Sequence, residues 1–508
     1  MKNQNHERKF GMSLIFIVGI AVCLLTILRS DSKLGYNRAK LIRLSGSTYE
    51  IGYQRAMLNL DEIKQWEGDS KRMSESPNGA ALQLTFQFHL TEIYEYFPSV
   101  INEWQGMADA AQLSLEDVAL HQVGERTIKR IAGLSLDNED EHEDRFEACS
   151  IFAMAKSDRG PIVGNTGDGS GFPSNPKVYY IEKENDAGQF RVVRCKGAGL
   201  NEKGLAIGSA NAHYSGWNSF PQGPASELSK VVLRYCPDVD SAVNFIKKYQ
   251  ISDDGNHYAM ADISGKAAAV EKGPGDLFNV RWADSTGYVF ATNTSPDSTL
   301  RSKCTSNQDY ITNADNRYAN FEHLFSDSSF TFTFAAAESI IFNHDSLGAI
   351  CQHGDRYPGQ WYTTRTRVML PQEGKILLAA KTAPEQQTWR PCETGWVEDT
   401  LTILTTDVKR QIASLPKRCR LAQNYPNPFN AQTTISYELA ENTQVELTIY
   451  NLLGEKVKTL KKEFQTKGEH ATVWDGRDEF GLVVASGIYY YQMKANDFVL
   501  TKRMTSIR

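Results

Sequence analysis

Ala148-Cys-Ser-Ile-Phe-Ala153 is the most informative stretch in this chain of 508 residues. It puts Cys149 at the start of a predicted strand, directly after the acidic run Asp137-Asn-Glu-Asp-Glu-His-Glu-Asp144, which is expected to be an exposed loop because like charges repel. A cut before Cys149 would give one residue both a thiol nucleophile and an α-amine base, since an α-amine has an unperturbed pKa of about 7.7–8.0. The alternative is an ordinary buried or disulfide-bonded cysteine.

The pattern around this cysteine predicts a layered α+β body. Residues 39–146 are mainly helical in pattern, and Ser114-Leu-Glu-Asp117 is a capping box that opens a helix. Beyond Ser150, period-2 strands alternate with pairs of helices, which is typical of helices covering antiparallel sheets. The predicted strands are 151–155, 161–165, 178–184, 189–195, 205–211, 259–263, 266–271, 278–282, 288–293, 366–370 and 375–380. The predicted helices are 226–236, 241–249, 316–325 and 334–342.

Composition indicates a globular protein of several domains. The net charge of −6 gives no basic surplus for a nucleic-acid partner, and 41% hydrophobic with 23% charged residues excludes a disordered or multi-span membrane chain. No His-Glu-x-x-His, phosphate-binding loop, Gly-x-Ser-x-Gly or Cys-x-x-Cys motif is present, so we expect neither cofactor nor metal. Besides Cys23 and Cys149, six cysteines remain, which leave 15 possible full pairings open.

The N-terminus indicates export. Three basic residues precede the apolar run 14–28, LIFIVGIAVCLLTIL. A run of about 15 apolar residues fits a secretory signal better than a membrane span, which needs about 20. We assign residues 1–35 to a signal peptide, with an uncleaved N-terminal anchor as the alternative.

Residues 421–508 have a different pattern, with short period-2 runs separated by glycines, and predict a small all-β sandwich without a catalytic cluster. They resemble the C-terminal sorting domain of type IX secretion. The motifs that carry the resemblance are Tyr425-Pro-Asn-Pro-Phe-Asn430, Val445-Glu-Leu-Thr-Ile-Tyr-Asn451, Trp474-Asp-Gly476, Ser486-Gly-Ile-Tyr-Tyr490 and Lys502-Arg-Met504. The resemblance implies passage through the type IX machinery to the outside or the outer cell surface. A carbohydrate-binding sandwich is the alternative.

Motifs in the body carry a second resemblance. In chain order they are Leu44-Ser-Gly-Ser-Thr-Tyr-Glu-Ile-Gly52, Cys149-Ser-Ile-Phe-Ala153, Gly164-Asn-Thr-Gly-Asp168, Gly199-Leu-Asn-Glu-Lys-Gly-Leu205, Ala261-Asp-Ile-Ser-Gly265 with Val270-Glu271, Ala291-Thr-Asn293, Ile350-Cys-Gln-His353 and Thr366-Arg-Val-Met369. Together they resemble the acyl-coenzyme A:isopenicillin N acyltransferase family of N-terminal-nucleophile (Ntn) hydrolases, with penicillin V acylases and bile-salt hydrolases. The resemblance implies a four-layer αββα fold with a helical pro-segment at 36–148, a catalytic region at 149–405 and a linker at 406–420.

The resemblance also implies roles for individual residues. Cys149 would be the nucleophile and new N-terminus, and Asp168 would bind its α-amine. Asn293 would donate a side-chain hydrogen bond to the oxyanion, with a backbone N–H near Asn211 as the second donor. The alternative for Asp168 and Asn293 is a turn-forming role.

An arginine that steadies the nucleophile has two candidates. Arg317 is the first and Arg365 its rival, while the alternative for Arg317 is a surface charge on a helix. The chain departs from the family in having Ala148 where glycine commonly precedes the nucleophile, which could hinder self-cleavage. It also has Asn165-Thr-Gly-Asp168 in place of an Asn-aromatic-Asp turn.

The expected function is an exported, self-cleaving hydrolase of linear amides that acts through a thioester. Its substrates would be small N-acyl compounds of the penicillin V or bile-salt type. Two alternatives remain open: an acyltransferase that uses a small amine as acceptor, and a non-catalytic surface binding protein.

Overall fold

The computed structural model describes residues 40–124, 128, 149–169, 178–214, 225–249, 255–273, 275–345, 348–352, 362–380, 396–403, 419–496 and 498–507. The expected signal at 1–35, the acidic run, Ala148 and most of the linker lie outside the described residues. No helix within the described ranges combines the length and the apolar character needed to cross a membrane.

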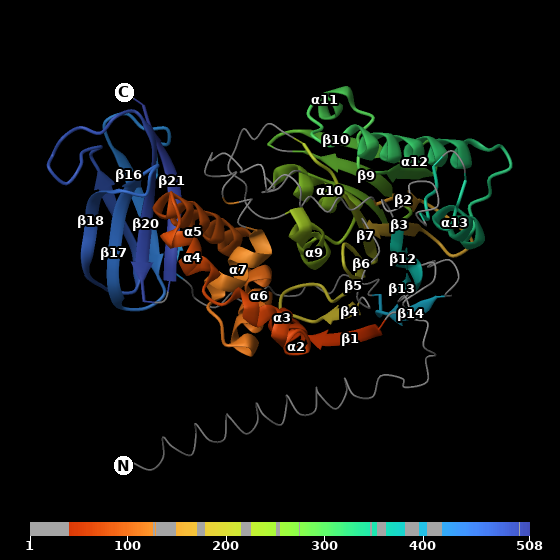
Figure 1. Ribbon diagram of the computed structural model, residues 1–508, viewed down its shortest axis with the longest axis horizontal. Coiled ribbons are helices and arrows are strands. Elements are labelled where there is room, and N and C mark those ends of the chain that lie inside the picture. The colour runs from red at the N-terminus through yellow and green to blue at the C-terminus, as the bar shows by residue number, and fades with distance from the viewer. Residues whose placement is uncertain are drawn as a thin grey trace, which may run out of the picture.

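The segment before Cys149 is one strand followed by helices (Figure 1). Ser47 caps the first helix through a capping box with Glu50, and Ser114 accepts a hydrogen bond from the backbone N–H of Asp117 at the last one. The elements are β1 (Lys40–Gly46), α2 (Thr48–Leu58), α3 (Leu60–Ile63), a 3-10 turn (Lys64–Trp66), α4 (Asp69–Glu75), α5 (Gly79–Tyr96), α6 (Pro98–Ala111) and α7 (Leu115–Val123).

The body contains two large sheets. The strand order is β1-β4-β5-β6-β7-β8-β9-β10 in the first sheet and β11-β2-β3-β12-β13-β14 in the second. Their bounds are β2 Ile151–Met154, β3 Ile162–Gly169, β4 Val178–Glu184, β5 Val192–Cys195, β6 Ala198–Asn201, β7 Leu205–Asn211, β8 Asn256–Asp262, β9 Ala267–Lys272, β10 Phe278–Trp282, β11 Tyr288–Ala291, β12 Tyr362–Leu370, β13 Lys375–Ala380 and β14 Val397–Thr400.

The two sheets pack on each other through small apolar residues, many of them alanines of β7, β8 and β9. Side chains alternate along β2, so Ile151 faces the core between the sheets while Phe152 faces helices α12 (Gln308–Ser326) and α13 (Phe334–Ile341). On the other sheet, α9 (Ala225–Tyr235) and α10 (Val239–Lys248) pack against β7 and β8. A short helix, α11 (Ser298–Arg301), precedes α12. This mixed architecture agrees with the predicted α+β class.

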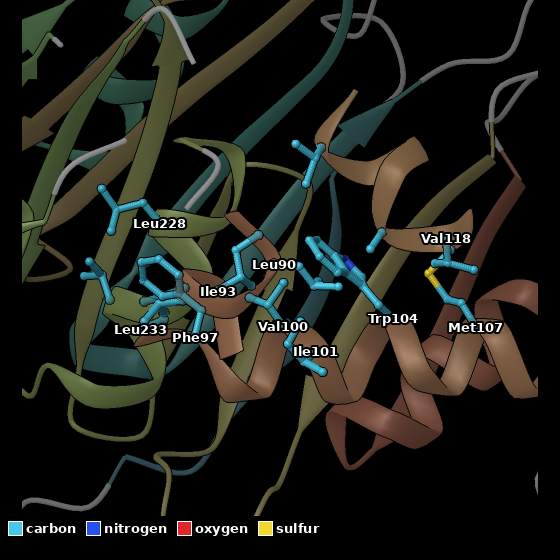
Figure 2. Close-up of a cluster of buried hydrophobic side chains, with 14 of the residues drawn as sticks. Leu90, Ile93, Phe97, Val100, Ile101, Trp104, Met107, Val118, Leu228 and Leu233 are labelled. Atoms are coloured by element: carbon cyan, nitrogen blue, oxygen red, sulfur yellow. The ribbon is translucent and has the colours of Figure 1, made fainter. Parts of the chain in front are cut away.

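The helices of the N-terminal segment extend the core on the α9 side. Figure 2 shows this cluster, in which Leu228 and Leu233 of α9 lie at one end beside Phe97. Leu90 of α5 lies in the middle, and Trp104 of α6 lies towards the other end. Trp104 is among the largest fully buried side chains of the chain. The N-terminal segment is therefore part of the same hydrophobic core as the region after Cys149.

Several elements differ from the sequence-based expectation, and neither β14 nor α11 was predicted. The sequence pattern missed β1, which pairs in parallel with β4 and adds an edge strand to the first sheet. It also missed β6, a short strand within a stretch that the sequence analysis treated only as a family motif. Helix α12 begins at Gln308 rather than 316, because Asn307 caps it by accepting a hydrogen bond from the backbone N–H of Tyr310.

The C-terminal region is all-β, as predicted. A three-stranded sheet β15-β16-β19 packs against a four-stranded sheet β18-β17-β20-β21 around Ile435, Leu447 and Trp474. The bounds are β15 Arg420–Leu421, β16 Thr433–Leu439, β17 Thr443–Asn451, β18 Lys456–Gln465, β19 Gly468–Trp474, β20 Gly487–Ala495 and β21 Phe498–Ser506.

Candidate active site

Cys149 lies at the buried entrance to β2, a strand in the interior of the second sheet. The backbone N–H of Thr166 donates to the carbonyl oxygen of Ser150 over 2.8 Å, and the N–H of Ser150 donates to Oγ1 of Thr166 over 3.0 Å. These bonds continue the antiparallel pairing of β2 with β3 up to Cys149. The cysteine thus enters the sheet at a fixed position, next to the strand that carries Asp168.

Arg317 and Asn293 hold the backbone of Cys149. The N–H of Cys149 donates to Oδ1 of Asn293 over 2.8 Å. Arg317 reaches from α12 and donates to the carbonyl oxygen of Cys149, to Ser150 Oγ (2.9 Å) and to Asn293 Oδ1 (2.8 Å). All four residues are buried. A charge-assisted bond from Arg317 fixes the carbonyl of Cys149, and a neutral bond to Asn293 fixes its amide nitrogen.

A chain of buried amides connects Arg317 to Asp168. Arg317 Nε donates to Asn313 Oδ1 over 2.9 Å, and Asn313 Nδ2 donates to Gln352 Oε1 over 2.8 Å. Gln352 Nε2 then donates to Asp168 Oδ2 over 2.8 Å, while Thr363 Oγ1 donates to Oδ1 over 2.7 Å. The carboxyl group, the guanidinium and Cys149 therefore belong to one hydrogen-bonded network.

Burial raises the pKa of Asp168 from its ordinary value of 3.8 to about 6. The positive charge of Arg317 and the hydrogen bonds from Thr363 and Gln352 oppose this effect without overcoming it. Burial also lowers the pKa of Arg317, against the attraction of Asp168 and of Cys149. A buried carboxyl group whose pKa is raised toward neutrality is a common feature of catalytic sites.

Asn211, the last residue of β7, meets Asn293 through its backbone carbonyl. Asn293 Nδ2 donates to that oxygen over 2.7 Å. The sequence predicted a backbone N–H near Asn211 and a free side-chain donor on Asn293. The structure instead brings the two residues together with the donor of Asn293 bound to the carbonyl of Asn211.

The segment that carries Asn293 is held on both sides. Nδ1 of His257 lies 2.7 Å from the carbonyl oxygen of Thr292, which can only accept, so Nδ1 carries the proton. Nε2 is then free to accept from the hydroxyl of Tyr214, 2.6 Å away. Beyond Asn293, Ser295 Oγ donates to the carboxylate of Glu271.

Of the two arginine candidates, Arg317 donates hydrogen bonds to the carbonyl of Cys149 and to Asn293. Arg365 lies on β12 and packs its guanidinium over Gly167, where an added Cβ would come within 2.6 Å of Cζ. Its charge lowers the pKa of Asp168, after the larger effects of burial, Arg317 and two hydrogen bonds. Gly167 makes room for this second arginine, and the stretch Asn165–Asp168, which we expected from the sequence to be a turn, lies within strand β3, where it pairs with β12.

The sequence did not identify several members of the network. Gln352 was inside a quoted motif but had no role, and Asn313, Thr363 and His257 gave no sequence signal because only tertiary folding brings them to the site. Ala148 and His353 lie outside the described residues. Among the described residues, no group of three potential metal ligands gathers, and no two cysteines are joined in a disulfide.

Two parts of the chain match known families. Residues 191–380 match the acyl-coenzyme A:6-aminopenicillanic acid acyl-transferase family, and residues 426–497 match the FlgD Ig-like domain. The first match includes Asn293 and Arg317 but begins after Cys149 and Asp168. It supports the resemblance to this acyltransferase family over that part of the chain. No curated protein sequence matches the chain.

Solved structures give weak similarities. A mutant of conjugated bile acid hydrolase from Clostridium perfringens aligns at 13% identity over 51% of this chain and 98% of its own, with a TM-score of 0.31. Penicillin V acylase from Agrobacterium tumefaciens aligns at 14% identity over 46% and 83%, with a TM-score of 0.32. PorZ, a surface component of the type-IX secretion system of Porphyromonas gingivalis, aligns at 18% identity over 27% and 15%, with a TM-score of 0.14. Similarities this weak identify no shared substrate.

Proposed function

We propose that the chain is a self-cleaving cysteine Ntn amidohydrolase that acts on small linear amides. The observation that carries the proposal is the fixation of Cys149. Its amide nitrogen is bonded to Asn293 and its carbonyl to Arg317, at the start of an interior strand. An ordinary core cysteine has no need of a buried arginine and a buried asparagine directed at its main chain.

In the proposed self-cleavage, the thiol of Cys149 attacks the carbonyl carbon of Ala148. The peptide C–N bond breaks as a thioester forms, and the leaving nitrogen, which carries one hydrogen, takes the thiol proton to become the new α-amine. Water then hydrolyses the thioester and restores the thiol, leaving a carboxylate on Ala148. The hydrogen bond from the Cys149 N–H to Asn293 supports this step, because it orients the scissile peptide.

In the proposed turnover, the α-amine takes the thiol proton and the thiolate attacks the substrate carbonyl. The positive charge of Arg317 beside Cys149 favours the thiolate. Asp168, once ionised, would hold the α-ammonium group. The substrate C–N bond breaks as the amine leaves with a proton, and water cleaves the thioester to a free acid. Asn293 Nδ2 is the proposed oxyanion donor, and for this it must exchange the Asn211 carbonyl for the substrate oxygen.

The test is turnover of a panel of N-acyl amino acids, penicillin V, bile-salt conjugates and acyl-homoserine lactones. We expect release of free acid from at least one class, and its loss after thiol alkylation or in Cys149→Ala. Binding of a compound without turnover would favour the binding-protein alternative and overturn the enzyme.

An acyltransferase is the second candidate, and the family match over residues 191–380 favours it. The same thioester would then be attacked by a small amine instead of water. Supplying a competing amine separates the two reactions. An amide product at the expense of the free acid indicates transfer, and free acid alone indicates hydrolysis.

We also propose that the chain is exported and that residues 421–508 direct it through type IX secretion. The apolar run 14–28 and the C-terminal motifs support this proposal. In a bacterium with that machinery, deletion of 421–508 should retain the protein inside the outer membrane. Equal surface exposure of the deleted and full-length chains would contradict it.

A further inference from the structure

Helix α5 has two opposite apolar faces. Leu82, Phe86 and Leu90 form one row and are buried in the core of the body. Leu84 and Phe88 each follow a residue of this row by two positions. Two positions turn about 200° around the helix, so these two side chains lie on the opposite face. Both are 5% exposed. A helix with two opposite apolar faces requires a partner on each of them, so the sequence of α5 predicts that another element packs on the Leu84 face.

The occupant is the C-terminal sandwich, and the contact runs along the helix. Figure 1 shows α5 against the sheet that contains β20 and β21. Near the start of α5, a Cβ added to Gly454 would lie 2.6 Å from the carbonyl carbon of Ala80. At the middle, Leu84 and Phe88 pack with Tyr490, whose ring centre is 5.9 Å from that of Phe88.

The end of the contact is polar and specific. Lys502 Nζ lies 2.9 Å from Glu92 Oε1, with side chains only 5% and 10% exposed. The backbone N–H of Thr501 donates to Thr91 Oγ1 over 2.8 Å. Since β21 is the edge strand of its sheet, α5 covers a backbone donor that an isolated sandwich would leave to water.

The surface of α5 belongs to the segment before Cys149, whereas the sandwich follows the catalytic region in the chain. The N-terminal segment is itself buried in the core of the body and supplies β1 to its first sheet. It therefore contacts both other parts of the molecule.

We propose that the Leu84 face of α5 is the receptor for the C-terminal sandwich. The N-terminal segment thereby keeps the sandwich attached to the body even when the stretch between residues 403 and 419 is cut. The sandwich is thus held twice, once by the chain and once by this interface. The proposal does not depend on the proposed enzymatic reaction.

The test introduces a specific protease site between residues 403 and 419 of the full chain. After cutting, we expect the fragment from residue 419 onward to co-elute with the rest on size exclusion at micromolar concentration. Lys502→Glu places two carboxylates next to each other in the interface. The cut variant should therefore dissociate at protein concentrations at least tenfold higher than those at which the cut wild type dissociates. The double variant with Glu92→Lys restores opposite charges and should restore co-elution.

Lys462→Glu is the matched control, because this lysine is exposed on β18, at the other edge of the same sheet. Dissociation of the cut wild-type chain at the same concentration as Lys502→Glu would overturn the proposal, as would a swap that does not restore binding. If Lys502→Glu fails to fold, the proposal is tested instead by hydrogen exchange at the backbone amide of Thr501 in the cut wild-type protein. Protection supports the interface, and exchange as in the isolated fragment contradicts it.

Discussion

Two buried polar clusters in this molecule have similar burial and opposite electrostatics. At the candidate site, burial raises the pKa of Asp168 to about 6 despite the charge of Arg317. In the cluster beside α6, burial would likewise raise the pKa of Glu184, but Arg234 and Arg194 outweigh it and bring the value to about 2. The two pKa values differ because only Glu184 is hydrogen-bonded directly to a cation. Arg234 donates two hydrogen bonds to Glu184, whereas the neutral side chains of Gln352 and Thr363 donate to Asp168.

The second cluster joins the N-terminal segment to the body. Glu103 of α6 lies 2.7 Å from Arg55, 3.2 Å from Lys230 and 3.4 Å from both Arg194 and Arg234. Charge is neutralised there, which suits assembly. At the candidate site, neutral side chains rather than an arginine donate hydrogen bonds to Asp168, and its pKa is raised. A raised carboxyl pKa is common at catalytic sites. The predictions below separate these two roles.

Replacing the nucleophile should have the largest effect. Cys149→Ala removes the thiol, so we expect no self-cleavage and a fall in kcat/KM of at least about 10³-fold. Mass spectrometry and steady-state kinetics measure the two effects. Cys236→Ala, which alters a cysteine buried in the helical core, is the control and should be cut normally. Equal activity of the two variants would remove Cys149 from the mechanism.

Breaking the second cluster should act on stability. Glu103→Gln removes the one carboxylate shared by four cations, each of which keeps another carboxylate partner, at a cost of about 1–3 kcal/mol. Urea unfolding measures this against Glu441→Gln, a surface control. Because surrounding cations outweigh burial and hold the pKa of Glu103 well below its usual 4.5, its contribution is present above pH 4.5 and is lost as pH falls further. An unchanged unfolding midpoint would show that the cluster does not hold the segment.

Asp168→Asn should lower kcat/KM by about 10²-fold while the chain stays folded. In wild type, the ionised fraction of Asp168 falls as pH drops through about 6, so kcat/KM should fall with it, and the variant should lack this limb. The raised pKa means that this group's contribution to stability is largest below pH 3.8 and decreases as pH rises through 6. Asp186→Asn, a half-buried carboxyl whose pKa is also raised by burial, is the control. A pH profile unchanged in Asp168→Asn would contradict the assignment.

His257 should give the smallest effect, because it acts on Asn293 through the carbonyl of Thr292. We expect His257→Phe to lower kcat by about tenfold with little change in KM. His257→Asn should recover most of the loss, because its side-chain N–H can replace Nδ1 as donor. If both variants lose activity equally, together with thermal stability, the residue is structural only.

The candidate site and the second cluster also differ in how far they could be predicted from the sequence. Cys149, Asp168, Asn293 and Arg317 were identified because motifs in chain order carried the family resemblance, and folding brings them into one network. Gln352 and Thr363 could not be found, since their contacts with Asp168 depend on the path of the chain between them. Arg55 and Glu103 lie on α2 and α6, and no sequence motif pairs them. β1 was missed because its partner, β4, lies more than a hundred residues away and only pairing makes it a strand.

The central claim is that Cys149 becomes an N-terminal residue. N-terminal sequencing and intact mass of the purified, active protein test it most directly. We expect two chains that stay together under native conditions, one of which begins Cys-Ser-Ile-Phe-Ala. A fully active, uncut chain with Ala148 still joined to Cys149 would contradict it.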